Sequence, residues 1–176
     1  GRLYVGGLFR AVSSGSVITK CKNLKEATIT VKPKSIATEI MMAAFVSYLS
    51  GSTEIAFTDC SNEADVTVAA EYGNGVYMGA LFGQVYSKDA TLFLTFTRCN
   101  NSGNITLDPK TRAFGFNMYS GFVTYLSANT VKNTVKANNI TNSGNIYLND
   151  KLEDVVATGA FCGYLRNNKS LIMSNS

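Results

Sequence analysis

Histidine and tryptophan are absent from the 176 residues, proline occurs twice, and only 16% of the residues are charged. Without histidine, the chain lacks the usual general base near neutral pH and the commonest metal ligand. The low charge and a hydrophobic content of 45% exclude a disordered tail. No apolar run approaches the ~18 residues of a membrane-spanning helix, so we expect no transmembrane segment in this chain.

The residues that are abundant favour β-structure. The chain contains 15 glycines, 9 tyrosines and 10 phenylalanines, together with many asparagines, serines and threonines. Aromatic residues are common in strands, whereas Gly, Asn and Ser are common in turns. A chain of this length is expected to form one domain.

An internal repeat organises the chain. Cys21, Cys60 and Cys99 are each 39 residues apart, and an asparagine follows each of them by two positions. A fourth copy keeps the asparagine as Asn142 but carries Ile140 in place of the cysteine. Apolar pairs with strand-like spacing follow in each copy: Ile29/Val31, Val66/Val68, Ile105/Leu107 and Ile146/Leu148.

A second series has nearly the same period. It consists of a phenylalanine preceded by small residues, at Phe9, Phe45, Phe82, Phe122 and Phe161, with intervals of 36, 37, 40 and 39 residues. Two independent series with one period indicate about four and a half copies, and a repeat must be recognised before any other fold assignment.

Each copy reads as short strands separated by polar turns. In the third copy the expected strands are 80–85, 91–98, 104–107 and 113–118, and segment 36–48, the one fair helix candidate, is also interpreted as strand. All-β units of this length that stack in a line predict a parallel β-helix, or β-solenoid. A β-propeller or β-sandwich is the alternative, although a propeller usually carries a signature such as Trp-Asp.

Stacking explains the choice of residues at the repeated positions. We expect the phenylalanines and the aliphatic pairs to form inward ladders, and the asparagines to bond along a column. Gly103 and Gly144 are expected to supply positive φ at the same corner. Because 39 residues is long for a coil of three strands, we expect two coils per repeat, about nine rungs and a rod of about 43 Å.

The repeated cysteines have three readings. A metal site would need closer spacings such as C-x-x-C, or added histidine. Two coils per repeat would place neighbouring cysteines about 9.6 Å apart, too far for disulfides. The cysteines are therefore interpreted as buried thiols packed as hydrophobic residues, and Cys162 lies outside their column.

Two stretches resemble known repeats. The segments 159–165 (GAFCGYL) and 99–105 (CNNSGNI) resemble the GLUG-type repeats of microbial surface proteins and, more loosely, the repeats of polymorphic membrane proteins. The resemblance spans nearly the whole chain, although Glu26-Ala27 and Glu63-Ala64 replace Asn-Ser-Gly in the first two copies. It implies an extracellular right-handed β-helix in an adhesin or surface antigen, with no catalytic residues and no cofactor.

On this basis residues 1–176 are expected to form a single solenoid segment, cut from a longer surface protein. The expected function is non-enzymatic adhesion, with a protein or glycan on another cell surface as partner. Flanking domains or a second chain are expected to cap the open ends of the coil, because exposed strand edges pair readily.

Two other functions remain alternatives. A polysaccharide lyase or hydrolase would need converging acidic residues, for which Asp59, Glu63, Asp65 and Arg98 are the densest candidates. A structural assembly or coat protein would use the uneven charge, since residues 1–40 carry seven basic and two acidic residues while residues 50–90 carry one basic and six acidic.

Two sets of candidate binding or modification residues stand out. A basic cluster that could contact an anionic glycan comprises Lys20, Lys22, Lys25, Lys32 and Lys34. It lacks interleaved aromatic residues, so nucleic acid is not expected as a partner. Possible N-glycosylation sites, which favour an extracellular location, are Asn100, Asn104, Asn139 and Asn168.

Overall fold

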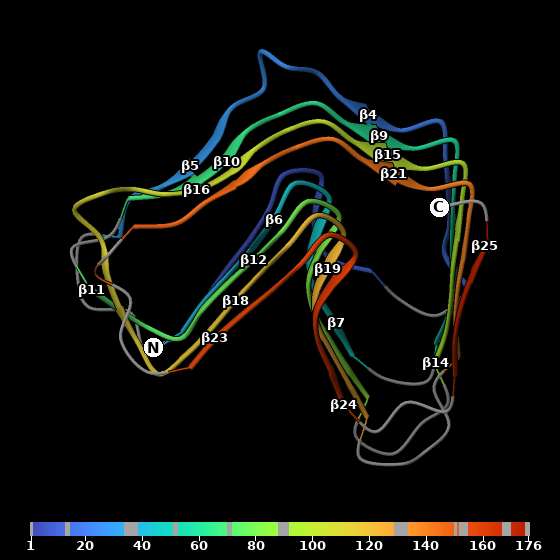
Figure 1. The fold of residues 1–176 in the computed structure, drawn as a ribbon. Helices are drawn as coiled ribbons and strands as arrows, with labels where there is room; N and C mark the ends of the chain where they lie inside the picture. Colours follow the sequence, from blue (N-terminus) through green and yellow to red (C-terminus); the bar gives the residue numbers. More distant parts are fainter. Residues whose placement is uncertain are drawn as a thin grey trace.

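The computed structural model describes residues 2–12, 15–33, 39–50, 53–69, 72–87, 92–128, 134–149, 151, 155–166 and 170–174. These residues form 25 strands and no helix, and every strand pairing among them is parallel (Figure 1). The chain is an all-β parallel solenoid, as the repeat predicted. The described part of segment 36–48, residues 39–48, holds β6 and the start of β7 and so is strand as expected, while residues 36–38 lie outside the described residues.

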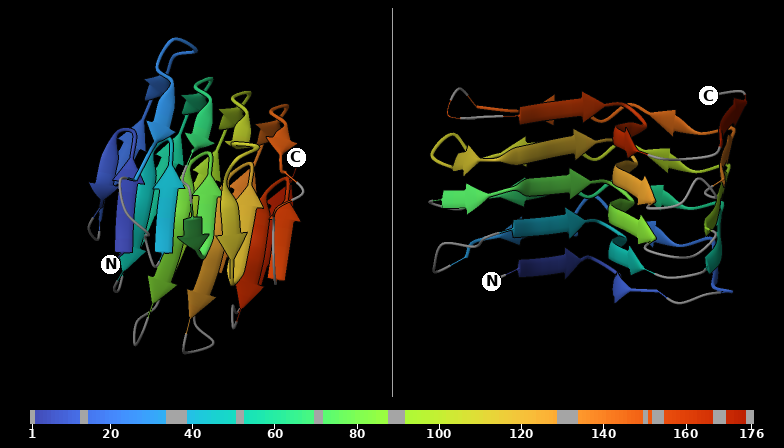
Figure 2. Two further views of the ribbon diagram at one scale, coloured as in Figure 1. Left: turned by 90° about the vertical axis from the view of Figure 1, so that its left-hand side faces the viewer. Right: turned by 90° about the horizontal axis from the view of Figure 1, so that it is seen from below.

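Five main sheets run along the solenoid, each with one strand from successive coils (Figure 2). Sheet A contains β1 (Arg2–Gly6), β6 (Glu39–Ala43), β12 (Val76–Gly79), β18 (Phe116–Ser120) and β23 (Val155–Gly159). Sheet B contains β2 (Phe9–Ala11), β7 (Val46–Ser50), β13 (Phe82–Ser87), β19 (Val123–Ala128) and β24 (Cys162–Arg166). Sheet C contains β3 (Val17–Thr19), β8 (Thr53–Thr58), β14 (Leu92–Thr97), β20 (Thr134–Asn138) and β25 (Ser170–Ser174).

The remaining sheets complete each coil. Sheet D contains β4 (Lys22–Asn23), β9 (Ser61–Asn62), β15 (Asn100–Asn101) and β21 (Thr141–Asn142). Sheet E contains β5 (Ile29–Val31), β10 (Val66–Val68), β16 (Ile105–Leu107) and β22 (Ile146–Tyr147). A two-stranded sheet pairs β11 (Tyr72–Asn74) with β17 (Arg112–Phe114).

One repeat makes one coil, so the expectation of two coils per repeat is wrong. In sheet E, Val66 pairs with Ile29 on one side and with Ile105 on the other. Each coil uses five or six short strands and their turns, and this consumes the whole repeat. Five stacked strands give a length of about 19 Å rather than 43 Å at the usual strand spacing.

The coil has two lobes because the corner between sheets A and B points inward, toward sheet D (Figure 1). Asn23 on β4 donates from Nδ2 to the carbonyl of Ala44 at this corner, at 2.7 Å. A Cβ on Gly79 would lie 2.0 Å from the carbonyl oxygen of Phe82. Gly6 and Gly159 meet the equivalent carbonyl oxygen in their coils, whereas the second and fourth coils have the small residues Ala43 and Ser120 at this position.

The interior consists of apolar columns. The aliphatic pairs of sheet E point inward as predicted, and Val66, Val68, Ile105 and Leu107 are buried. The phenylalanine column needs a correction, because strand pairing aligns Phe82 with Val46 rather than with Phe45. The turn between sheets A and B has the same length in every coil, and the phenylalanine is its last residue in some coils (Phe45) and the first residue of the sheet B strand in others (Phe82). The rings still meet, because Phe57 on β8 contacts Phe45 at 6.4 Å and Phe82 at 4.8 Å between centroids.

The repeated asparagines form a buried ladder rather than a turn. Asn62 donates from Nδ2 to Oδ1 of Asn101 at 2.8 Å, and Asn101 donates in the same way to Asn142 at 2.7 Å. The ladder predicted from the sequence is confirmed for these copies. Each bond joins two adjacent coils, so the ladder stabilises sheet D from inside the solenoid.

The positive φ angles lie elsewhere than predicted. Outside glycine, they occur three residues before each asparagine, at Lys20, Asp59, Arg98 and Asn139, with φ between 50° and 55°, and three glycines, Gly15, Gly75 and Gly115, also have positive φ. Gly103 and Gly144 have no positive φ. They are glycines because a Cβ at either position would lie 2.1 Å from a carbonyl oxygen of the preceding coil.

The first coil differs from the others by a longer turn between sheets D and E. Asn23 and Ile29 are six residues apart, whereas Asn62 and Val66 are four apart, and yet the pairing registers of both sheets are kept. The extra residues form a turn closed by a hydrogen bond from the Ala27 amide to the Leu24 carbonyl, at 2.9 Å.

The structure contains no helix within the described residues that is long and apolar enough to cross a membrane.

Candidate functional site

Tyrosines from sheets A and B face one another across the outside of the inward corner. Tyr4 of sheet A contacts Tyr48 of sheet B, with ring centroids 5.1 Å apart, and Tyr77 contacts Tyr125 in the same way at 6.1 Å. All four rings are half-buried, and we refer to them as the tyrosine face. Half-buried tyrosines offer an apolar ring and a polar hydroxyl together, which suits them to binding surfaces.

Strand register explains the regular spacing of the tyrosine face. Tyr4 pairs with Met41, Met41 pairs with Tyr77, and Tyr77 pairs with Met118, so tyrosines stand on the first and third coils of sheet A, and the fifth coil has Ala157 at this position. Met41 lies between Tyr4 and Tyr77, Met118 lies on the other side of Tyr77, and both methionines are buried, at 2% and 3% exposure. The result is a row of aromatic pairs that repeats along the solenoid axis about every 9.6 Å, two strand spacings.

An ion pair lies beside these rings. Arg2 Nε is 2.5 Å from Glu39 Oε2, across the pairing of β1 with β6. Glu39 and a hydrogen bond with Tyr4 raise the pKa of the Arg2 guanidinium. Burial, with the Glu39 carboxylate and Tyr125 adding to it, raises the pKa of Tyr77 to about 12. The Tyr77 hydroxyl therefore stays neutral at any physiological pH.

The predicted basic cluster is partly engaged within the solenoid. Lys22 Nζ lies 2.7 Å from Glu63 Oε1 on the next coil. Lys20, Lys25 and Lys32 are exposed, and Lys25 stands in the long turn of the first coil. Lys34 lies outside the described residues. Lys22 is exposed as well, and along the first coil Lys20 precedes β4, Lys25 lies between β4 and β5, and Lys32 follows β5.

The acidic residues proposed as a catalytic group each bind a different partner. Asp59 and Arg98 form a two-point ion pair at 2.6 and 3.0 Å, and this hydrogen bonding lowers the pKa of the Asp59 carboxyl. Asp65 accepts a hydrogen bond from the Asn104 amide at 2.7 Å. These contacts all run between adjacent coils, so the carboxylates serve the stacking of the solenoid.

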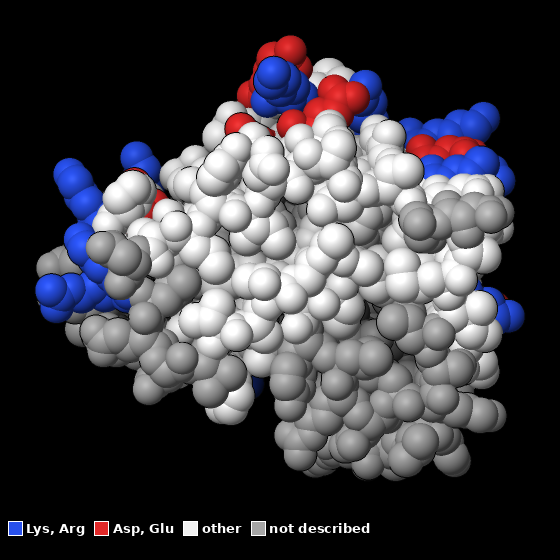
Figure 3. All heavy atoms as spheres, in the orientation of Figure 1, with Lys and Arg blue, Asp and Glu red and all other residues white. Residues whose placement is uncertain are grey.

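Lys20, Asp59 and Arg98 occupy equivalent places on successive coils and alternate in charge. Figure 3 shows alternating blue and red rows at the upper right, over the corner between sheets C and D. The face turned toward the viewer, which is the C-terminal end of the solenoid, carries its charge mainly at the periphery (Figure 3). Charge is thus concentrated along the edges of the coils.

The glycosylation sequons occupy different environments. Asn100 and Asn139 are exposed, Asn139 at the left-handed corner, and both could carry a glycan without displacing the core. Asn104 is half-buried and its Oδ1 accepts a hydrogen bond from the Asn145 amide. Asn168 lies outside the described residues.

The cysteines line up in a column, one coil apart. Cys60 and Cys99 are buried, and Cys21 is half-buried at the end of the column. Neighbouring cysteines are therefore one strand spacing apart, about 4.8 Å, and the predicted distance of 9.6 Å was wrong. None of the four cysteines forms a disulfide. A hydrogen bond from Cys99 lowers the pKa of the Cys60 thiol, whereas this bond and burial raise the pKa of Cys99.

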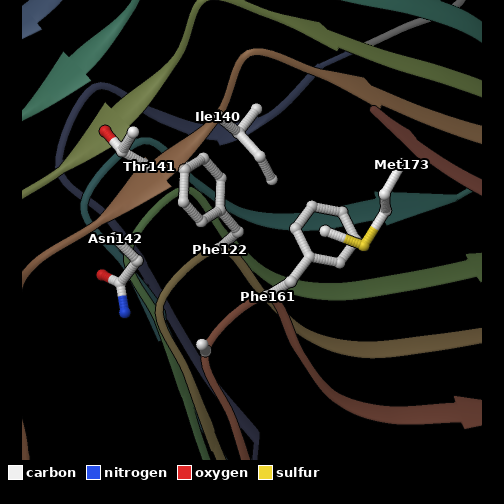
Figure 4. A pocket seen from close by; sticks show the side chains of 7 residues that line it. Phe122, Ile140, Thr141, Asn142, Phe161 and Met173 are labelled. Atoms are coloured by element: carbon white, nitrogen blue, oxygen red, sulfur yellow. The ribbon is translucent and has the colours of Figure 1, made fainter. Parts of the chain in front are cut away.

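A groove opens at the C-terminal end of the solenoid, beside β21 and β22. Its apolar half is a cavity of about 340 Å³, in which Phe122, Ile140, Phe161 and Met173 face one another (Figure 4). Its polar half is a cavity of about 400 Å³ between β22 and residues 158–160. Both halves share Asn142 and Ala160, so the groove is continuous along β21 and β22.

Neither the tyrosine face nor the groove was predicted. The recurrence of Tyr48 and Tyr125 at one repeat position was the sequence signal for the tyrosine face, but their pairing with sheet A depends on the inward corner. Within the described residues, no group of three or more Cys, Asp or Glu side chains could hold a metal ion. Comparisons with protein-family models, with curated proteins and with solved structures find no match to this chain.

Proposed function

We propose that this chain is a non-enzymatic module of an extracellular surface protein, and that it binds a glycan polymer through the tyrosine face. The observation that supports the proposal is the row of aromatic pairs Tyr4–Tyr48 and Tyr77–Tyr125, repeated along the axis. Aromatic rings can stack on the apolar faces of sugar rings, while hydroxyl groups and the nearby Arg2–Glu39 pair offer hydrogen bonds.

Repetition suits a repetitive ligand. Each aromatic pair alone would bind weakly, but two pairs on one rigid solenoid engage two units of a polymer at once, which multiplies the affinity. Solenoids in general present extended surfaces of this kind. The exposed sequons Asn100 and Asn139 are in keeping with an extracellular setting.

The rival enzymatic function receives less support. Acid–base chemistry on a polysaccharide needs carboxylates that converge on one substrate position. Asp59 and Glu63 instead bind Arg98 and Lys22 on neighbouring coils. We therefore assign these carboxylates to the stability of the solenoid.

A glycan array probed with the chain displayed in multivalent form tests the proposal. We expect Tyr48→Ala combined with Tyr125→Ala to weaken binding of the selected glycan by about tenfold or more, since each lost stacking contact is worth about 0.5–1.5 kcal/mol. Tyr147→Ala is the matched control, because Tyr147 is 52% exposed on sheet E, away from sheets A and B. Binding that survives the double substitution, or no glycan binding at all, would contradict the proposal.

A further inference from the structure

The outer face of sheet C forms one side of the solenoid, away from the corner between sheets A and B. In Figure 1, β14 and β25 of this sheet run along the right-hand side of the coil. The three central strands, β8, β14 and β20, are each paired on both sides within the stack. Their side chains alternate, because Ile55, Leu94 and Val135 are buried and the neighbouring residues point outward.

The outward residues of these strands place an aromatic ring between two opposite charges. They form two columns across the strands, Glu54–Phe93–Thr134 and Ala56–Thr95–Lys136. Phe93 is 47% exposed on the middle strand, and Glu54 and Lys136 are exposed on the strands at either side of it. Neither charge belongs to an ion pair among the described residues.

A two-fold axis makes this face complementary to itself. Glu54 pairs with Phe93 and Lys136 pairs with Thr95, so the point midway between the two charges falls on β14, at Leu94. An axis through this point, perpendicular to the sheet, places Glu54 of one copy over Lys136 of the other. The same axis places Phe93 over Thr95. Each contact then occurs twice, as in every isologous interface.

The contacts made in this way are favourable. Opposite charges face each other at both ends of the interface, which fixes the orientation of the two copies and favours their encounter. An aromatic ring packs at the centre against a threonine, where interfaces usually concentrate their apolar contacts. The small side chain of Ala56 faces Thr134, so no bulky residue keeps the two sheets apart at this position.

We propose that this chain associates with a second copy of itself through the outer face of sheet C, as a two-fold dimer with antiparallel solenoid axes. Five strands of five residues offer about 400 Å² per copy, half the area of a standard interface, so the dimer is weak and forms in a concentration-dependent manner. The tyrosine face belongs to sheets A and B and is not covered. The inference therefore goes beyond glycan binding and does not depend on it.

Charge reversal tests the proposed interface. Sedimentation equilibrium should show monomers and dimers of the parent chain, with fewer dimers at higher salt. We expect Glu54→Lys and Lys136→Glu, each alone, to weaken dimerisation by about tenfold or more, because both charge contacts become repulsive. An equimolar mixture of the two variants should dimerise as well as the parent, since the introduced lysine faces the introduced glutamate and the two native charges face each other. A monomeric parent, or a mixture that associates no better than its components, would overturn the inference.

Matched controls locate the interface. Glu26→Lys and Lys110→Glu change the net charge by the same amounts at exposed turn positions outside sheet C, and they should leave dimerisation unchanged. Phe93→Ala should weaken the dimer by about tenfold or more, because it removes the central aromatic contact. Phe116→Ala, at a 52% exposed ring on sheet A, should have no effect. Equal effects of the two phenylalanine substitutions would contradict an interface on sheet C.

Discussion

Asn101 is the most connected residue of the asparagine ladder. Its Oδ1 accepts from Asn62, and its Nδ2 donates to Asn142 and to the Gly103 carbonyl at 3.0 Å. The residue is 2% exposed, so water cannot replace these partners. A buried amide that bonds in three directions fixes the register of three coils at once.

Replacing this amide should therefore be costly. We expect Asn101→Ala to lower the free energy of unfolding by about 2–4 kcal/mol, because it removes three side-chain hydrogen bonds and leaves the buried Asn62 Nδ2 with only the Ala64 carbonyl as acceptor. Denaturant titration measures the change. Asn100→Ala, on the same strand but exposed, should change stability by less than about 0.5 kcal/mol. Similar losses at the two positions would contradict a structural role for the ladder.

The raised pKa of Tyr77 makes the stability of the chain depend on pH in the alkaline range. Its pKa in the folded chain is about 12, raised mainly by burial, whereas an unfolded tyrosine titrates near about 10. A raised pKa contributes stability that is complete below pH 10 and is lost as the pH rises toward 12. The unfolded state, which ionises first, is favoured in that window.

Tyr77→Phe should remove this contribution. As the pH rises from 9 to 11.5, we expect the free energy of unfolding of the parent to fall by about 1–2 kcal/mol more than that of Tyr77→Phe. A two-unit shift equals about 2.7 kcal/mol, and solvent near the half-buried ring reduces it. Denaturant midpoints at both pH values measure the difference. The same substitution at exposed Tyr147 is the control, and an equal effect there would rule out the environment of Tyr77 as the cause.

At the scale of single strands, β14 shows how one element serves both core and surface. Phe96 points inward and its ring contacts Phe57, Phe82, Phe122 and Phe161, at centroid distances between 5.7 and 6.0 Å. Phe93 on the same strand is 47% exposed. The strand thus joins aromatic rings from four coils through one side chain.

Truncating these two phenylalanines should lower stability by very different amounts. We expect Phe96→Ala to lower the free energy of unfolding by about 3–5 kcal/mol, the usual range for a buried ring that leaves a cavity. Phe93→Ala should cost less than about 0.5 kcal/mol. Thermal or denaturant unfolding of both variants measures this, and comparable losses would refute the assignment of Phe96 to the centre of the core.

The elements could be predicted from the sequence because they depend on local patterns. The spacing of Cys21, Cys60 and Cys99 predicted the repeat, and the alternation in segments such as Ile105–Leu107 predicted inward strands. The positive φ at Lys20 and Arg98 could not be predicted, since neither residue is typical of left-handed turns. The alignment of Phe82 with Val46 escaped prediction because a phenylalanine can reach the core from the last turn residue, as Phe45 does, or from the first strand residue, as Phe82 does.

At the scale of the whole molecule, the number of coils was predicted incorrectly because it depends on one long-range contact. At the inward corner the Ala44 carbonyl accepts a hydrogen bond from Asn23, 21 residues earlier, and nothing in the local sequence predicts this bond. The corner lengthens the perimeter of each coil, halves the expected number of rungs, and brings sheets A and B together. The tyrosine face and the cysteine spacing follow from it.

The long turn of the first coil shows that the solenoid accepts additional residues between sheets D and E. Two additional residues stand between Asn23 and Ile29, and yet β4 and β5 pair with the second coil as regularly as later strands do. This site can therefore carry insertions without a change in strand pairing. A foreign epitope placed between Lys25 and Glu26 would be displayed on a rigid support, which makes the chain a starting point for engineered antigen presentation.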